Sequence, residues 1–382
     1  MKILLLKENK EELRVSLVPA DVAKLVEFKH TVFVQAGAGS SAGFKDAEYV
    51  AAGAKIVKDC KQIILQGIDF IFKLSEPNKN ILKLLKPETI LVGLFNAVNN
   101  TKPLFQMLKF KTTSLGLESI QQNGYYPIIV PCEQVKGRIG ALVAAYNLTK
   151  LNRHAIGKTV TEILHSREKA HFVILHLSYA AVEAAKTILS LGADLTILAS
   201  DKEAITDVKE RNDLKTLAHI NHCKFEITRA DFTNLNNHIA TADVLINTSP
   251  APGSLTPKRI TVAMISTMPH GSVFVDLAVD QGFSSDTEKE PTTIKKPTVF
   301  VNGVTHFYLE NTASLFAHSL SNSISGLIMD IIFKKSEITG INTVKNNEIL
   351  YNAILTYNGK LTSKIVSETL HIEGVTIKSL LK

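Results

Sequence analysis

The sequence of 382 residues has no tryptophan and only three cysteines. Cys60, Cys132 and Cys223 are odd in number and widely spaced, which excludes a disulfide framework. Long apolar runs are missing too. The most apolar stretch, residues 324–333, is short and is interrupted by Asp330, whereas a membrane span needs about 18–20 apolar residues. We therefore expect no membrane span.

The N-terminal stretch has little that could serve as a secretory signal. Only the four apolar residues 3–6 come in a row before charged residues return. A signal peptide needs a longer apolar region. We therefore expect a cytoplasmic protein.

Arginine is also scarce. Only seven of the 43 basic residues are arginine, and the lysines are spread along the chain, although the net charge is +7. Nucleic-acid-binding surfaces concentrate lysine and arginine on one face. The charge is therefore interpreted as scattered, solvated lysine, and no nucleic-acid partner is expected.

Apolar residues are abundant, and they come as short strand-like runs that alternate with helix-like stretches. The length predicts about two domains of roughly 150–200 residues each. The alternation predicts βαβ units, mostly parallel sheets and therefore an α/β fold class. The expected strands are 3–6, 31–34, 69–74, 89–94, 113–117, 171–175, 195–198, 242–247 and 272–280.

Helices are expected between these strands and at the C-terminal end. One should begin after Pro19, and another should have Asp46 as its N-cap. A longer helix should follow Pro131 and should connect the two domains. The apolar residues at 135, 139, 142, 143 and 146 should form one face of it. A further helix is expected at 179–191, and the chain after about residue 304 should be helical.

Two glycine-related turns were compared with the dinucleotide fingerprint Gly-x-Gly-x-x-Gly. Gly37, Gly39 and Gly43 follow a strand, but their spacing does not match, because position 42 is alanine. A tight turn is the better interpretation, even though Asp59 lies where a ribose-binding acid would be wanted.

The second turn, residues 176–181, lies in a clean βαβ unit, where a fingerprint would be expected. His176 and Ser178 stand where the first two glycines would give a pyrophosphate bare backbone, and only Ala181 approximates the third. The next strand ends at Ala199, and Asp201 lies two residues beyond the usual ribose-binding position. These five residues are the candidate cofactor contacts, in a degraded form of the motif.

A metal site was considered at HINHC, where His219, His222 and Cys223 are close in sequence. A further cluster of ligand residues is missing, so surface side chains are the better interpretation and no metal is expected.

Six segments of the chain together match a known family. The chain resembles the alanine dehydrogenases and the related nicotinamide nucleotide transhydrogenase α subunits. The resemblance continues through 291–293 and 306–311. The main matching segments are KENKEELRVSLVPADVAKL (7–25), TVFVQAGAG (31–39), DAEYVAAGAKIV (46–57), EQVKGRIGALVAAYNL (133–148), ADVLINTSPAPGSLTPKRIT (242–261) and GSVFVDLAVDQG (271–282).

The resemblance implies an interleaved fold. A discontinuous α/β substrate domain would comprise residues 1–130 plus 305–382. A Rossmann-like domain with a doubly wound parallel sheet, residues 131–304, would be inserted in it. The resemblance also implies a homo-oligomer, and it places the turn at 37–39 in the substrate domain.

The implied reaction is the NAD-dependent oxidation of L-alanine to pyruvate and ammonia, so a small amino or keto acid is the implied ligand. The family's substrate-binding arginine falls on Arg14, whose planar guanidinium suits a carboxylate; a surface salt bridge is the alternative. The aspartate near the nicotinamide falls on Asp280, for which a loop-capping role is the alternative.

Two other catalytic positions are changed. The family's catalytic lysine falls on Ser75, and Lys73 lies two residues earlier on the same face of a strand, with its root displaced by about 6–7 Å. The acid/base histidine falls on Asn96, whose amide cannot move a proton near neutral pH. Asn311 is retained from an otherwise altered cofactor-facing stretch, 310–322.

These departures leave two hypotheses. In the first, an altered dehydrogenase still binds a nicotinamide cofactor; Arg14, Asp280 and the PAPG loop at 250–253 support it. In the second, the protein is a catalytically inactive binding or regulatory scaffold. Loss of one acid/base group typically costs about 10²–10⁴ in rate. We therefore expect alanine dehydrogenase activity to be altered or lost.

Overall fold

The computed structural model describes residues 1–166, 168–199, 208–248, 260–333, 344 and 347–380. The chain forms two compact units. Unit 1 comprises Met1–Pro131 and Ser314–Lys382, and unit 2 comprises Cys132–Ala313. The second boundary lies later than the expected position after residue 304, because β13 (Val304–Phe307) pairs with β11 (Val273–Asp276) in the sheet of unit 2.

Unit 1 contains an eight-stranded sheet with the order β15-β14-β6-β5-β4-β1-β2-β3. The strands β1 to β6 pair in parallel, and β14 and β15 extend the sheet antiparallel to their neighbours. Its elements are β1 (Lys2–Leu5), α1 (Pro19–Glu27), β2 (Thr31–Gln35), η1 (Ser40–Ala42), α2 (Asp46–Ala51), β3 (Lys55–Val57), α3 (Cys60–Leu65), β4 (Phe70–Phe72), α4 (Lys79–Leu82), β5 (Ile90–Gly93), α5 (Thr101–Lys109), β6 (Thr113–Gly116), η2 (Leu117–Ser119), α11 (Ala317–Ile332), α13 (Glu348–Asn352), β14 (Ile354–Tyr357), β15 (Lys360–Leu361), α14 (Lys364–Leu370) and α15 (Ile377–Leu380).

Two local predictions for unit 1 were wrong. The chain after residue 304 is not wholly helical, since β14 and β15 form a hairpin on the edge of this sheet. Asp46 is the first residue of α2, and its N-cap is Lys45. The Asp46 carboxylate accepts the Gly37 N–H at 2.9 and 3.1 Å. It thereby closes the glycine turn, in which Gly37 has a φ of 73°. The prediction of a turn there is confirmed.

One helical segment has the length and apolar composition of a possible membrane span. Among the described residues, the segment Thr312–Ile332 is long and apolar enough to cross a membrane, but half of its most apolar 18-residue stretch is buried inside the protein. Two serines of α11 also bind the N-terminal segment: Ser321 Oγ accepts the Val15 N–H at 2.9 Å and Ser325 Oγ accepts the Val18 N–H at 3.0 Å. These contacts are those of a core helix.

Unit 2 contains a seven-stranded sheet with the order β12-β13-β11-β10-β7-β8-β9. Without β12, which is antiparallel to β13, this is the doubly wound Rossmann order, so the predicted fold class is confirmed. Its elements are α6 (Ile129–Asn147), β7 (His171–Leu175), α7 (Tyr179–Ser190), β8 (Asp194–Ala199), α8 (Val208–Ile220), β9 (Phe225–Arg229), α9 (Phe232–Thr241), β10 (Val244–Asn247), α10 (Val262–Thr267), β11, η3 (Val279–Gln281), β12 (Val299–Val301), β13 and η4 (Thr312–Phe316).

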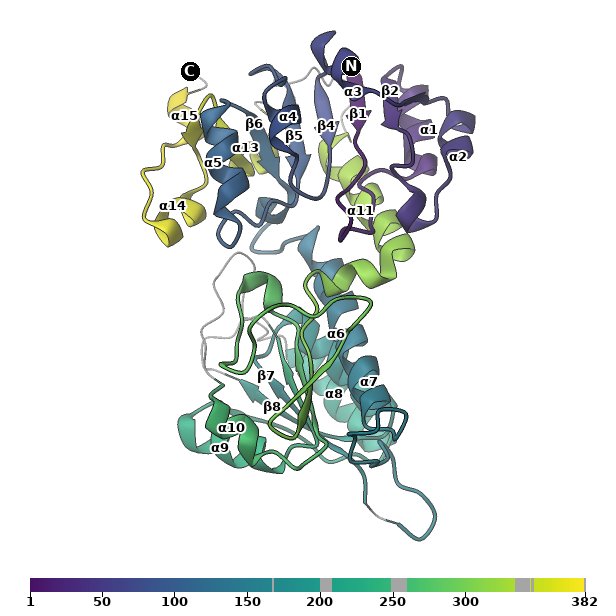
Figure 1. Ribbon diagram of the computed structural model, residues 1–382, viewed down its shortest axis with the longest axis vertical. Coiled ribbons are helices and arrows are strands. Elements are labelled where there is room, and N and C mark those ends of the chain that lie inside the picture. The colour runs from purple at the N-terminus through teal and green to yellow at the C-terminus, as the bar shows by residue number, and fades with distance from the viewer. Residues whose placement is uncertain (167, 200–207, 249–259, 334–343, 345–346, 381–382) are drawn as a thin grey trace. The chain divides into compact units, whose positions relative to one another are not determined.

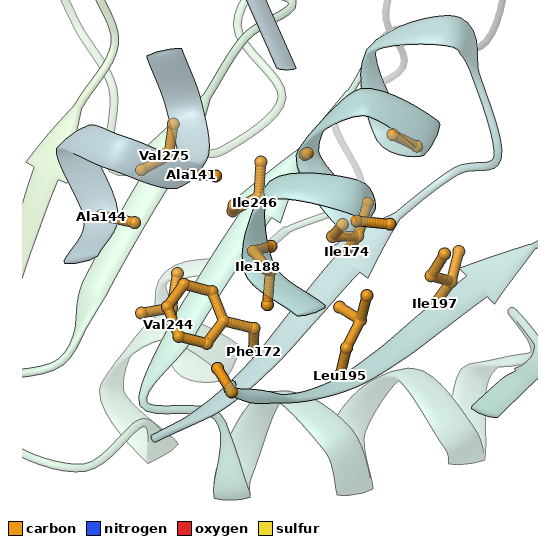
Figure 2. Packing of buried hydrophobic residues seen from close by; sticks show 14 of the residues in the cluster. Ala141, Ala144, Phe172, Ile174, Ile188, Leu195, Ile197, Val244, Ile246 and Val275 are labelled. Carbon is orange, nitrogen blue, oxygen red and sulfur yellow. The ribbon is translucent and has the colours of Figure 1, made fainter. Parts of the chain in front are cut away.

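Helices cover both faces of this sheet (Figure 1). Successive side chains of a strand point to opposite faces. Phe172 and Ile174 of β7 accordingly pack with α6, α7 and α8 in one core, part of which Figure 2 shows. Val173 and Leu175 pack with α9 and α10 in the other. The continuous apolar run of β7 is thus typical of a strand buried on both sides.

The predicted apolar face of α6 is buried only in part: Ile139 is buried and Val143 packs against the core. Leu142 and Tyr146 are 48% and 58% exposed. Small residues face α7 instead, and a Cβ added to Gly137 would lie 2.0 Å from the Ala180 carbonyl oxygen. α6 also begins before Pro131, which is tolerated in a first helical turn because the N–H groups there have no intrahelical partner.

The close approach of α6 and α7 leads to a stability prediction. Gly137→Ala should lower the free energy of unfolding by about 1–3 kcal/mol, since the added methyl group forces the two helices apart. Urea unfolding measures this. Gly326→Ala in α11 is the matched control, because its new Cβ would meet no atom within 4 Å; helix propensity alone should then make it neutral or slightly stabilising. Equal effects of the two substitutions would contradict the prediction.

Candidate functional site

Arg14 follows β1 in unit 1 and is only 5% exposed. Its Nε donates to Glu12 Oε1 at 2.8 Å, and its Nη2 donates to Glu12 Oε2 at 2.6 Å. Sequence reasoning offered Arg14 as a carboxylate binder, with a surface salt bridge as the alternative. The structure gives a buried, bidentate pair with a carboxylate of the protein itself. Glu12 was missed, although the ELR spacing was a signal for it.

Lys73 and Ser75 lie just beyond the carboxyl end of β4, and they contact each other. The Lys73 ammonium donates to Ser75 Oγ at 2.7 Å, to Asn9 Oδ1 at 3.1 Å and to the Lys7 carbonyl oxygen at 3.1 Å. It also lies 3.5 Å from Glu8 Oε2. The Lys73 ammonium thus reaches the Ser75 hydroxyl although its Cα lies two residues earlier in the chain.

Glu8, which sequence reasoning missed, completes this cluster. Its carboxylate accepts the Ser75 hydroxyl at 2.7 Å and the Leu74 and Ser75 N–H groups at 2.7 and 2.9 Å. Burial raises the pKa of the Glu8 carboxyl, and the Lys73 charge opposes this rise. Burial lowers the pKa of the Lys73 ammonium, opposed mainly by Glu8. The Ser75 hydroxyl also accepts the Asn9 N–H at 3.1 Å, so protein groups satisfy it fully.

Asn96 follows β5, the neighbour of β4 in the sheet. Its backbone is left-handed, with a φ of 45°. The Asn96 and Phe95 N–H groups both donate to Glu118 Oε1, at 3.0 and 3.1 Å. Burial raises the pKa of Glu118 to about 7. Glu118, another carboxylate absent from the predictions, therefore fixes the turn that presents Asn96.

In unit 2, the turn after β7 retains a glycine-like backbone without glycine. His176 has a φ of 70° and is buried. Ser178 is the N-cap of α7; its Oγ accepts the Ala181 N–H at 3.2 Å and donates to Thr248 Oγ1 at 3.0 Å. Ala181 is fully buried in the core. A helix N-terminus binds phosphate through such N–H groups, and here one of them is already engaged by Ser178.

The remaining cofactor candidates are less informative. Ala199 ends β8, and its carbonyl oxygen accepts the Ala230 N–H at 2.9 Å. Asn311 is half-buried, with a φ of 55°, directly before η4. Asp201 and the PAPG loop at 250–253 lie outside the described residues.

Asp280 lies in η3, beyond the carboxyl end of β11. Its Oδ2 accepts a hydrogen bond from the Lys136 ammonium at 2.7 Å, and the same ammonium lies 3.0 Å from Glu133 Oε1. Burial alone would lower the pKa of Lys136, but Asp280 and Glu133 raise it above its ordinary value. Burial raises the pKa of Glu133, and Lys136 opposes this rise. The i,i+3 spacing of Glu133 and Lys136 in a helix was an unused signal for this pair.

A second acidic pair was also missed. The Asp276 carboxylate, at the end of β11, accepts from Asn247 Nδ2, the Ala278 N–H and both the N–H and hydroxyl of Ser284, at 2.6–3.1 Å. Glu288 is 3% exposed, and its Oε2 accepts the Ser285 N–H at 3.0 Å. Its Oε1 is buried and has no hydrogen-bond partner among the residues that the structure describes. Burial first, and then Asp276, raise the pKa of Glu288 to about 10.

Among the described residues, no group of three or more His, Cys, Asp or Glu side chains is placed to hold a metal ion. The half-buried Cys223 thiol lies 3.4 Å from the Asn221 carbonyl oxygen and 3.6 Å from that of Leu189.

The topology thus defines a two-unit α/β protein with one Rossmann-like unit. Polar clusters lie at the carboxyl ends of strands in both units. The family models "Alanine dehydrogenase/PNT, N-terminal domain" and "Alanine dehydrogenase/PNT, C-terminal domain" match residues 4–134 and 141–364. The chain belongs to the alanine dehydrogenase/PNT family, which confirms the resemblance seen in the sequence.

Individual relatives agree with this membership. The chain is similar to alanine dehydrogenase 2 of Staphylococcus aureus (strain USA300), with 29% identity over 384 residues and 100% of both chains covered. A solved L-alanine dehydrogenase has a TM-score of 0.83 and 26% identity, covering 97% of this chain and 99% of that one. A transhydrogenase from Sinorhizobium meliloti, with a TM-score of 0.73 and 21% identity, covers 95% and 99%; this second structural likeness shows the fold alone.

Proposed function

We propose that this protein binds a small amino or keto acid and that its NAD-dependent turnover of alanine is altered or lost. The single observation that carries the proposal is the Ser75 hydroxyl. It occupies the position of the family lysine, and Lys73, Glu8 and the Asn9 N–H use its full hydrogen-bonding capacity. Lys73 is itself held by four oxygen atoms. Neither group is placed as a ready proton donor or acceptor for a substrate.

The resemblance and the family relatives support further parts of the proposal. Unit 1 is proposed to bind the acid and unit 2 the nucleotide, in a cytoplasmic homo-oligomer. Arg14 would then bind the substrate only if its guanidinium contacted the ligand while it remained paired with Glu12. Asn96 can hydrogen-bond a carbonyl, and Asp280 would lie near the nicotinamide.

NAD is the cofactor that the family implies, and the residues of the phosphate turn fit it poorly. A pyrophosphate in the fingerprint arrangement needs bare backbone at positions 176 and 178. Here His176 carries a buried imidazole, and the Ser178 hydroxyl is bound to the helix end that would receive the phosphate. The turn therefore supports weakened dinucleotide binding.

Two measurements on the full-length protein test the proposal. Calorimetry with NADH should give an affinity weaker than micromolar. NADH oxidation with pyruvate and ammonia should be slower than about 1 s⁻¹, the lower end of ordinary enzyme turnover. Turnover at ordinary rates would overturn the proposal. A complete absence of NADH binding, with no turnover, would instead favour the inactive-scaffold form of it.

The phosphate turn gives a directed version of this test. Ser178→Gly should tighten NADH binding by about tenfold, because it frees the Ala181 N–H and lets a phosphate approach the backbone. Ser178→Ala is the matched control; it also removes the cap but keeps a Cβ at the closest point of approach. Equal NADH affinities of the two variants by calorimetry would show that bare backbone at this position is not what limits binding.

A further inference from the structure

An open cleft of about 590 Å³ lies in unit 2 at the opposite edge of the sheet from the phosphate turn. It is lined by the segment after α6 and by β12 and the start of β13. Thr305 lies near the amino end of β13, whereas the phosphate turn follows the carboxyl end of β7. Its volume is within the range of about 300–1,000 Å³ that small-molecule sites have.

Two cationic side chains line this cleft, Arg153 and Lys296. Both are exposed, and within the described part of the chain neither the Arg153 guanidinium nor the Lys296 ammonium has an ion-pair or hydrogen-bond partner. Two less exposed lysines of unit 2 differ in this respect. Lys136 and Lys158 are paired with Asp280 and Asp243, each at 2.7 Å. Two unpaired cations at one cleft favour an anionic ligand.

An aromatic platform lies beside these cations. The rings of His154 and Phe300, both lining residues, stack with centroids 4.2 Å apart and an interplanar angle of 17°. Phe300 is 37% exposed, and the His270 ring meets its edge at 5.8 Å. An exposed, braced aromatic face is a surface on which a planar ring stacks.

The segment that carries Arg153 and His154 is fixed before any ligand arrives. Asn152 Nδ2 donates to Thr305 Oγ1 at 3.0 Å, and Asn152 Oδ1 accepts the His154 N–H at 3.2 Å. These bonds connect the segment to β13. Binding therefore needs little ordering of the backbone, which reduces its entropic cost.

We propose that this cleft binds a nucleotide, with its phosphate between Arg153 and Lys296 and its base on the platform of His154 and Phe300. Guanidinium and ammonium groups are the usual phosphate partners, and the ring would stack independently of them. This site is separate from the phosphate turn, and the proposal does not depend on dehydrogenase activity.

Calorimetry with AMP, and separately with inorganic phosphate, tests the site on the full-length protein. AMP should bind with a dissociation constant near 0.1 mM, on the order of −5 kcal/mol. Arg153→Ala combined with Lys296→Ala should weaken AMP binding at least tenfold, the loss of about 1.4 kcal/mol. Lys295→Ala, which removes an exposed lysine that does not line the cleft, is the matched control and should change nothing.

The aromatic half of the proposal has its own measurement. Phe300→Leu should weaken AMP binding several-fold while leaving phosphate binding unchanged. Three outcomes would overturn the proposal. The first is no AMP binding by the unmodified protein at about 5 mM, which means a binding free energy weaker than about −3 kcal/mol. The second is AMP binding that survives the double substitution, and the third is phosphate binding as tight as that of AMP together with no effect of Phe300→Leu. The second outcome would place AMP elsewhere, for example on the phosphate turn.

Discussion

Replacing Glu288 with glutamine is expected to stabilise the protein by about 3 kcal/mol at pH 7. The Glu288 carboxyl is buried beside the Asp276 carboxylate, which accepts four hydrogen bonds. In this pair of carboxyl groups, Glu288 Oε1 is the oxygen that no donor reaches from the described part of the chain. A proton there would satisfy both carboxyl groups, and glutamine supplies an N–H of similar shape that it cannot lose.

The sign of the pH dependence follows from the raised pKa of Glu288, about 10 in the folded protein against an ordinary value of 4.5. Folding favours the protonated form of Glu288. The contribution of Glu288 to the free energy of unfolding is therefore fully present below about pH 4.5 and is lost as the pH rises through the folded-state pKa. At pH 7 the folded protein must hold a proton that the unfolded chain has released. One pKa unit corresponds to about 1.4 kcal/mol, which gives the expected magnitude.

Urea unfolding of the two proteins from pH 4 to pH 8.5 measures this effect. The difference should be near zero at pH 4 and should grow with pH. Glu290→Gln is the matched control, since Glu290 is exposed in the same loop and should change stability by no more than about 0.5 kcal/mol. If Glu288→Gln destabilises the protein at every pH, the fold requires the ionised form of Glu288. The conclusion that folded Glu288 carries a proton at pH 7 is then wrong.

Much of the fold was predictable from the sequence because strand signals are local. The run at residues 172–175 is apolar on both faces, and a run of that length is typical of a strand buried on both sides. The β14 and β15 hairpin was missed because two short edge strands carry little periodicity. The buried face of α6 was missed because Gly137 and its small neighbours pack by close approach, which hydrophobic periodicity does not detect.

The candidate site was predictable only in part, for a different reason. The positions of Ser75, Asn96 and Asp280 came from the family resemblance. Their partners are carboxylates and a lysine far away in sequence: Glu8 is 67 residues from Ser75, and Lys136 is 144 residues from Asp280. In the sequence, a loop residue whose charge is paired in the fold cannot be distinguished from one whose charge is solvated. The sequence therefore indicated these positions, but not the charged partners that hold their side chains.

Lys136 is the residue whose removal should cost the most. Its ammonium is buried between Glu133 and Asp280, with side-chain exposures of 6%, 10% and 30% in that order. Lys136→Met keeps most of the apolar volume but leaves two carboxylates without their cation. Breaking a buried ion pair in this way typically costs about 3–5 kcal/mol. Urea unfolding at pH 7 should show a loss of that size.

Two further variants separate the charge effect from packing. Lys136→Arg keeps the cation, so it should cost clearly less than Lys136→Met. Adding Glu133→Gln to Lys136→Met should recover part of the loss, because it removes the more buried of the two uncompensated carboxylates. The interaction between the two substitutions in a double-mutant cycle measures their coupling directly.

The pH dependence of the Lys136→Met variant completes the argument. Burial already raises the pKa of Glu133, and Lys136 opposes this rise. Without Lys136, the pKa of Glu133 should rise further, so Glu133 should take up a proton at a higher pH than in the unmodified protein. The loss of stability should therefore shrink as the pH falls toward 4. A loss that is the same at pH 4 and pH 7 would show that Lys136 acts through packing. It would also show that the positive charge of Lys136 does not stabilise Asp280.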